Sequence, residues 1–282
     1  MRRFLFMAGE WAVSMPLAFA DEEWSHTNTA RTLMQNDNGK YSRFNINENI
    51  EGLIYFASVE NKQIRRKNLE LLARNNVPCW PNPGKLLRID DRFTLLKECV
   101  DAGFVDHKVD FLTWNDRHTV TQDLPYVLKV GNCHQGEGKF LIHGDKMDHM
   151  EHWEGVASAE PYFMGGKSMR ALFIGKEEFA LEFTNPESWI KNSAGADCAR
   201  VDAPEEMMRH GRRVRDYFDL EVCGIDYVVD SDGTPHFLEF NCFPGVGSDD
   251  DVSNAARAIF RQKMDIVVSE ANSRSEQHLQ KR

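Results

Sequence analysis

Two acids and an amide lie close together in apolar sequence near the C-terminal end of the chain. Asp226 lies in Gly224-Ile-Asp-Tyr-Val-Val, and Glu239 and Asn241 lie in the next apolar run. Because successive strand residues point to opposite faces, Glu239 and Asn241 would share one face, beside Asp226 on the partner strand. Oxygen ligands of this kind suit a hard cation such as Mg²⁺ that also contacts phosphate oxygens. The alternative is that Glu239 faces solvent on an edge strand or pairs with an arginine.

A glycine-containing loop between two lysines is a candidate phosphate cradle. It runs Lys129-Val-Gly-Asn-Cys-His-Gln-Gly136-Glu-Gly138-Lys139. Glycines let backbone N–H groups approach phosphate oxygens closely, and the flanking lysines add positive charge. No Walker A sequence is present, and no Rossmann glycine pattern follows a strand. A phosphate-binding loop and an ordinary turn are therefore the two interpretations.

A third segment has the composition of an adenosine site. Glu160-Pro-Tyr162-Phe163 places an acid beside aromatic side chains, and Arg170 follows within an apolar strand. The rings could pack on a base, while the carboxylate could bind ribose hydroxyls. Arg170 needs an anionic partner if it is buried, and either a phosphate or a structural carboxylate would serve. Asn192 lies further along, in Trp189-Ile-Lys-Asn.

Together these residues resemble the ATP-grasp superfamily over residues 81–260. The segment from Leu124 to Asn192 looks most like synapsins, whereas the segment from Asp226 to Gly245 looks more like RimK-type amino-acid ligases. The resemblance implies an α/β protein with the ATP-grasp fold and a small N-terminal α/β domain. We expect the N-terminal domain over residues 1–83, the ATP-grasp domain in two sub-lobes over 84–270 and a disordered tail over 271–282.

The resemblance also implies a role for each matching residue. Those expected to contact ATP are Arg92, Lys129, Gly136, Gly138, Lys139, Glu160, Tyr162 and Phe163. Arg170 and Asn192 would lie near the transferred phosphoryl group, and Asp226, Glu239 and Asn241 would hold Mg²⁺ or Mn²⁺. Arg92 stands where the family commonly has a lysine. Its charge is the same, but a guanidinium binds as a planar fork, so the placement of the phosphates there is in question.

The activity implied by the resemblance is ATP-dependent ligation through an acyl phosphate, forming a peptide or amide bond. The partners would be a small-molecule carboxylate and an amine, such as an amino acid or peptide, and the resemblance also favours a homodimer. Two alternatives remain open. One is a synapsin-like ATP-binding regulatory scaffold without turnover, and the other is a kinase that transfers the γ-phosphate to a small molecule or protein.

Composition and charge exclude some classes of protein. With 34 basic and 44 acidic residues, the chain has a formal net charge of −10 and is a poor candidate for binding nucleic acid. No apolar run reaches the ~20 residues needed to span a membrane. Its six cysteines form no C-x-x-C pair, which fits reduced thiols in the cytoplasm. The first residues predict either a strand over Arg3–Ala8 or a signal peptide, and we favour the strand and a cytoplasmic protein.

Periodicity and turn residues predict the elements around these motifs. We expect strands over 50–57, 124–130, 139–142, 168–174, 178–183, 223–229 and 236–240, and helices over 64–75, 91–102 and 204–218. The polar segment 21–49 predicts loops. The acidic, His-rich segment 143–157 predicts an exposed helix, with a metal site at Asp145 and His149 as the alternative. Asp249–Asp251 could bind a substrate amine or cap the next helix, and we favour the cap.

Overall fold

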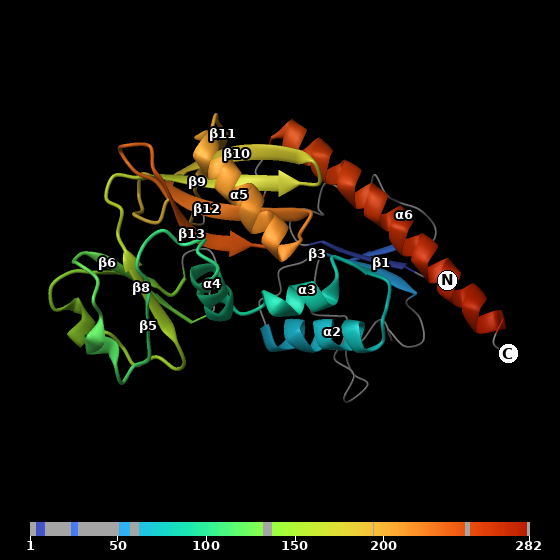
Figure 1. Ribbon diagram of the computed structural model, residues 1–282, viewed down its shortest axis with the longest axis horizontal. Helices are drawn as coiled ribbons and strands as arrows, with labels where there is room; N and C mark the ends of the chain where they lie inside the picture. The colour runs from blue at the N-terminus through green and yellow to red at the C-terminus, as the bar shows by residue number, and fades with distance from the viewer. Residues whose placement is uncertain are drawn as a thin grey trace.

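The computed structural model describes residues 4–8, 24–27, 51–56, 62–131, 137–193, 195–245 and 249–280. Within these residues the chain forms three β-sheets with helices packed around them (Figure 1). The central sheet is antiparallel, with strand order β11-β10-β9-β12-β13. Its strands are β9 (Lys167–Ile174), β10 (Glu177–Thr184), β11 (Asp197–Arg200), β12 (Val222–Val229) and β13 (Pro235–Asn241).

The apolar side chains of β9 point alternately into two hydrophobic cores, one on each face of this sheet. Ala171 and Phe173 point into a core shared with α5 (Glu205–Phe218), whereas Leu172 and Ile174 point into a core shared with α6 (Asp250–Gln280). Because side chains alternate along a strand, Arg170 lies on the same face as Leu172. The face opposite α5 therefore carries the polar residue Arg170 toward one end and apolar residues packed against α6 toward the other.

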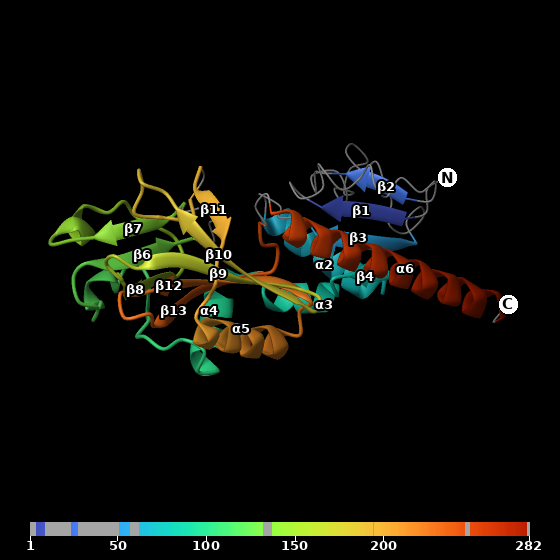
Figure 2. The ribbon, with the colours of Figure 1, turned by 90° about the horizontal axis from the view of Figure 1, so that it is seen from above.

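Two smaller sheets lie at opposite ends of the central sheet, on the side away from α5 (Figure 2). The first is antiparallel, with order β5-β8-β6-β7, and its strands are β5 (Asp110–Leu112), β6 (Tyr126–Val130), β7 (Lys139–Ile142) and β8 (Ala157–Pro161). The second is parallel, with order β2-β1-β3-β4, and its strands are β1 (Phe4–Ala8), β2 (Trp24–Thr27), β3 (Gly52–Phe56) and β4 (Cys79–Trp80).

The remaining helices lie between successive strands in the chain. They are α2 (Lys62–Arg74), α3 (Pro83–Arg88) and α4 (Arg92–Asp101), with short 3₁₀ helices η4 (Arg117–Thr119) and η5 (Lys146–His149). Helix α3 packs against α2, while α4 contacts β13 of the central sheet. The side chain of Asp91 caps α4 by accepting a hydrogen bond from the backbone N–H of Thr94 at 2.8 Å. Among the described helices, none has both the length and the apolar character needed to cross a membrane.

Most of the predicted elements are confirmed within one to three residues, including β1, the β6–β7 hairpin and helix α5. The predicted cap of the C-terminal helix α6 is also confirmed, because Asp249 Oδ1 accepts hydrogen bonds from the N–H groups of Asp251 and Val252. The prediction of loops throughout 21–49 was wrong at β2, a short strand paired with β1. The other residues of that segment lie outside the described part of the chain.

Two further predictions were wrong. Residues 143–157 do not form a helix: they contain η5 and then enter β8, because Met147 and Trp153 are buried in the core of the small antiparallel sheet. The disordered tail predicted over 271–282 is helical as far as Gln280, the C-terminal end of α6. Its first residue, Ala271, is buried in the core that α6 forms with β3, so packing extends the helix beyond the point where composition predicts fraying.

Candidate functional site

Three charged residues occupy neighbouring positions on three adjacent strands of the central sheet. In the strand register, Asp226 of β12 lies opposite Arg170 of β9 on one side and Glu239 of β13 on the other. Arg170 donates two hydrogen bonds to Asp226, from Nε to Oδ1 at 2.6 Å and from Nη2 to Oδ2 at 2.9 Å. Both side chains are buried. Burial acts against the charged form of Arg170, but the Asp226 carboxylate raises its pKa above the ordinary value.

Gly224 makes this arrangement sterically feasible. It lies two residues before Asp226, so both residues use the same face of β12. A Cβ atom at this position would lie 2.9 Å from Cδ of Arg170 and 2.8 Å from Cβ of Pro244. The hydrogen atom of glycine therefore leaves the space that the Arg170 side chain needs to reach Asp226.

Two loops contribute further contacts to the same ion pair. Asn192, between β10 and β11, donates from Nδ2 to Oδ2 of Asp226 at 3.4 Å. Arg170 Nη1 donates to the carbonyl oxygen of Gly245, after β13, at 3.3 Å. Asn241 lies opposite Gly224 in the register, and its Oδ1 accepts a hydrogen bond from the N–H of Phe243 at 2.9 Å. The structure thus brings both predicted catalytic residues and all three predicted metal ligands to one end of the sheet.

Glu239 is held by cations from two other parts of the fold. Its Oε2 accepts hydrogen bonds from Nη2 of Arg92, at the start of α4, at 3.3 Å and from Nζ of Lys139, at the start of β7, at 3.2 Å. Burial acts to raise the pKa of Glu239, but Lys139 and Arg92 hold it well below the ordinary value. Glu239 therefore remains an anion with two positive groups within reach.

A second buried ion pair joins Lys129 of β6 to Glu160 of β8. Lys129 Nζ donates to Oε2 of Glu160 at 2.5 Å and to the carbonyl oxygen of Leu238 at 3.2 Å, linking the small sheet to β13. Ser158 Oγ donates to the other carboxylate oxygen of Glu160 at 2.9 Å. Burial lowers the pKa of Lys129. Burial opposes ionisation of Glu160 as well, yet Lys129 and the hydrogen bonds lower its pKa to about 2.

The described ends of the glycine loop and the aromatic segment border these charges. Lys129 and Lys139 lie opposite each other in the β6–β7 hairpin, where like charges would repel unless each had an acid. Gly138 has φ of +67°, and its carbonyl accepts from the N–H of Val130 at 2.7 Å. Gly136 lies outside the described residues. Tyr162 makes an edge contact with Trp189, with ring centroids 6.0 Å apart.

The sequence interpretation missed the partners of Phe163. The Phe163 ring stacks on His236 of β13, with centroids 4.0 Å apart and planes 9° apart, and it makes an edge contact with His107. Ser158, the hydroxyl partner of Glu160, was also missed. Alternation along β8 placed Ser158 on the face of Glu160, which was a usable signal. Nothing local in the sequence pointed to His107 or His236.

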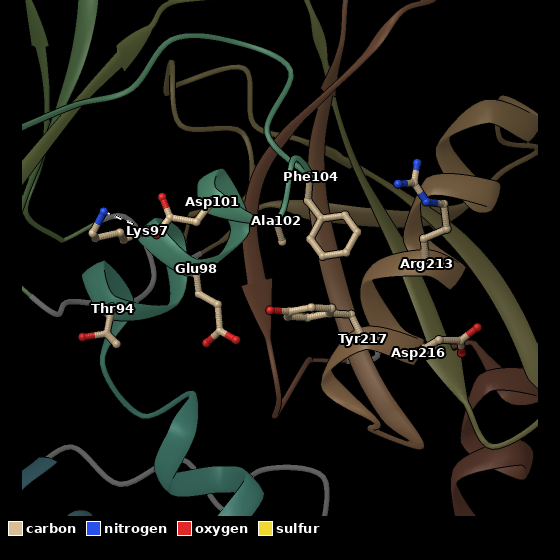
Figure 3. Close-up of a pocket in the computed structure, with 9 residues that line it drawn as sticks. All are labelled: Thr94, Lys97, Glu98, Asp101, Ala102, Phe104, Arg213, Asp216 and Tyr217. Carbon is tan, nitrogen blue, oxygen red and sulfur yellow. Dashed lines mark ion pairs between the residues drawn. The ribbon is translucent and has the colours of Figure 1, made fainter.

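An exposed charged turn and a hollow between two helices are two further surface features that lie apart from this site. His149 and Asp145 lie 3.5 Å apart but are largely exposed, as expected of a solvated charged turn. A hollow of about 780 Å³ lies between α4 and α5, and the Phe104 and Tyr217 rings in its lining make an edge-to-face contact (Figure 3). Its charged lining, from Lys97, Glu98, Asp101, Arg213 and Asp216, is of mixed sign. This hollow contains none of the predicted site residues.

Comparison with known proteins bears on the fold. No protein-family model matches the chain, and no curated protein matches its sequence. Among solved structures, a RiPP-associated ATP-grasp ligase from Chryseobacterium gregarium, in complex with ADP and a leader and core peptide, is 13% identical and superposes with a TM-score of 0.62. That match covers 93% of this chain and 97% of the other.

Two further structures agree with the first. D-alanine–D-alanine ligase from Bacillus anthracis is 12% identical, with a TM-score of 0.66 over 99% of this chain and 100% of the other. A RimK domain ATP-grasp protein from Sphaerobacter thermophilus is 14% identical, with a TM-score of 0.63 over 91% of this chain and 98% of the other. At such identities the likeness concerns the fold.

Proposed function

The chain has the ATP-grasp fold, and we propose that it is an ATP-dependent ligase that activates a carboxylate as an acyl phosphate for attack by an amine. A carboxylate oxygen of the substrate bonds to the γ-phosphorus of ATP, and the bond from that phosphorus to the β,γ-bridging oxygen breaks, releasing ADP. The amine nitrogen then bonds to the acyl carbon, phosphate leaves, and the nitrogen loses a proton to give the amide.

The donor chemistry of the site fits Mg²⁺ together with a triphosphate. Asp226, Glu239 and Asn241 offer carboxylate and amide oxygens, which hard cations prefer. Arg92 and Lys139 contact Glu239 directly, so positive groups for phosphate oxygens lie beside the candidate metal ligands. A bound Mg²⁺ would neutralise phosphate charge and so supply electrostatic stabilisation to phosphoryl transfer.

The protein side chains would mainly position the reactants. When ATP binds, Arg92 and Lys139 would leave Glu239 and contact phosphate oxygens instead, because both already lie beside the candidate metal ligands. Arg170 is fixed by Asp226 and would present its remaining N–H groups toward the transferred phosphoryl group, with Asn192 beside it. A guanidinium held in place before the reaction stabilises developing charge without reorganisation.

The Lys129–Glu160 pair would form the inner wall of the nucleotide site. Its contact with the Leu238 carbonyl fixes the small sheet to the strand that carries Glu239. Tyr162 and Phe163 follow Glu160 directly and would form the adenine-binding segment. A base packed there would place the phosphates toward Lys139 and the charged row on the central sheet.

The observation that carries the proposal is the row of Arg170, Asp226 and Glu239 across three adjacent strands, held in a defined register. Lysines and a glycine loop would be enough for a protein that only binds ATP. A buried arginine locked to one acid, beside a second acid bonded to two cations, is typical of a site that also stabilises transferred charge. A ligase accounts for the whole row, whereas a scaffold accounts only for part of it.

The test is turnover by purified full-length chain with Mg-ATP and pools of amino acids and short peptides. We expect ADP and free phosphate in equal amounts, only when both an acid and an amine are present. Glu239→Gln, assayed in parallel, controls for contaminating ATPases. Stoichiometric ATP binding without turnover would instead support the regulatory scaffold, and ADP formed with phosphate retained on the acceptor would support a kinase.

A further inference from the structure

Three residues outside the proposed nucleotide site bring metal-ligand atoms together. Asp106 and His107 lie in the loop after α4, and His236 lies near the start of β13. The Asp106 carboxylate faces both rings: Oδ1 lies 3.2 Å from Nδ1 of His107, and Oδ2 lies 2.7 Å from Nδ1 of His236. One ligand atom from each residue lies within 4.8 Å of those of the other two. The three side chains thus converge on a common point.

The second nitrogen of each imidazole faces a different carboxylate. His236 Nε2 lies 3.0 Å from Oδ2 of Asp230, in the turn before β13. His107 Nε2 is buried, has no direct hydrogen bond within the described part of the chain and lies 3.9 Å from Oε2 of Glu160. Histidines that bind metals in proteins usually present their other N–H to a carboxylate or carbonyl group, which fixes the tautomer. His236 has that arrangement, whereas His107 faces its second carboxylate at a distance too long for a hydrogen bond; both rings turn Nδ1 toward Asp106.

His236 lies between two acids, an arrangement that a bound cation would stabilise. A neutral imidazole has a single N–H donor. If Nε2 donates to Asp230, then Nδ1 presents a lone pair to an Asp106 oxygen 2.7 Å away, and two acceptors at that distance repel. Either a second proton on the ring or a metal ion between Nδ1 and the carboxylate removes this repulsion. His107, whose Nδ1 faces the same carboxylate, favours the metal because one ion satisfies both rings.

We propose that Asp106, His107 and His236 bind one Zn²⁺ ion through the carboxylate and the two Nδ1 atoms. Two imidazole nitrogens and one carboxylate suit zinc, whereas Mg²⁺ and Ca²⁺ prefer oxygen ligands alone. His107 and His236 are mostly buried, so their orientation is fixed, and the Asp106 side chain is 44% exposed, which leaves a route for the ion and a position for water. The proposal is independent of the ligase reaction.

The site has a structural consequence for the nucleotide pocket. Both histidines contact the Phe163 ring, and His107 faces Glu160, so the ion would lie directly behind the segment proposed to bind adenine. Bound zinc would link two segments that are distant in sequence, the loop after α4 and the start of β13. We therefore expect zinc to stabilise the folded chain even without nucleotide.

The test is calorimetric titration of Zn²⁺ into metal-free, nucleotide-free, full-length protein. Wild type should bind one ion per chain at this site, and Asp106→Asn and His236→Gln should each weaken binding at least ~100-fold. Asp230→Asn should weaken it by a smaller factor, roughly 10-fold, because it only orients His236. His149→Gln is the matched control, since His149 also lies beside an acid but is exposed, and its zinc affinity should equal that of wild type.

Thermal unfolding separates lost binding from lost folding. Without metal, Asp106→Asn should unfold as cooperatively as wild type, and only wild type should gain ~5 °C or more at a zinc concentration about one hundred times the dissociation constant. Absence of zinc binding by wild type would show that the three side chains form only a hydrogen-bonded cluster. Equal binding by wild type and the Asp106→Asn/His236→Gln double variant would place the ion elsewhere, for example on cysteines. Either result overturns the proposal without affecting the proposed ligase.

Discussion

Lys139 Nζ lies 3.2 Å from Oε2 of Glu239, although 100 residues separate them in the sequence. Arg92 approaches the same oxygen from α4 at 3.3 Å. A residue expected to hold the metal is thus bonded to two residues expected to hold the phosphates. Without nucleotide each of these charges has a partner of opposite sign, and Mg-ATP would let each group exchange its protein partner for the opposite charge of the ligand. The proposed site therefore avoids isolated buried charge in either state.

Glu239→Gln tests this exchange. The substitution keeps the shape of the side chain and removes its charge, so we expect turnover to fall roughly 100-fold or more. Binding of ATP without Mg²⁺ should change little or improve, because the amide no longer repels phosphate. Calorimetry with and without Mg²⁺ measures both affinities. A variant whose ATP affinity depends on Mg²⁺ as strongly as that of wild type would contradict the assignment.

Gly224→Ala should damage the site without changing any charged residue. The added methyl group would lie 2.9 Å from Cδ of Arg170 and 2.8 Å from Cβ of Pro244, so the arginine must move away from Asp226. We expect a loss of about 1–3 kcal/mol in the free energy of unfolding and a lower turnover number. Urea denaturation and ADP release measure the two effects.

Gly245→Ala is the matched control for stability, because a Cβ atom there meets none of the described residues within 4 Å. Its free energy of unfolding should remain within about 0.5 kcal/mol of wild type. If Gly224→Ala is equally mild, then Arg170 does not depend on the space above Gly224.

The lowered pKa of Glu160 predicts that the stability of the fold depends on pH in the acid range. Its pKa is lowered from 4.5 to about 2, so it stabilises the fold fully above its unfolded pKa, and this contribution is lost as the pH falls toward 2. Glu160→Gln lacks the contribution at every pH. The difference in unfolding free energy between wild type and Glu160→Gln should therefore be greatest above about pH 5 and shrink between pH 4.5 and 2. Denaturation in metal-free buffer across this range measures it, and a difference that stays constant would contradict the prediction.

Asp91 connects a helix cap to the proposed phosphate contact. It caps α4 through Thr94, and Arg92 is the first residue of that helix. Asp91→Ala should cost about 1 kcal/mol in stability. It should also raise the KM for ATP, because the first turn no longer fixes the direction of Arg92. Asp91→Asn, which retains a capping oxygen, should restore most of both properties, whereas a loss as large as in Asp91→Ala would indicate that the charge, and not the cap, is required.

The sequence by itself determined the local arrangements of this site. Alternation in β13 placed Glu239 and Asn241 on one face, and the short turn before that strand placed Asp226 beside them, because hairpin partners must pair. The predicted hairpin likewise placed Lys129 and Lys139 at the two ends of the glycine loop. Helix and strand periods are local properties of a chain, so most of the described elements could be predicted from them.

Only the tertiary structure decided which distant groups meet. Arg92 reaches Glu239 across 147 positions, and His236 reaches Asp106 across 130, and no local period relates such pairs. The same holds for residues 143–157, where burial of Met147 and Trp153 replaced the expected helix, and for the last turns of α6, where packing extended a helix that composition predicted to fray. In each case contacts between separate segments, absent from any window of the sequence, outweighed local preference.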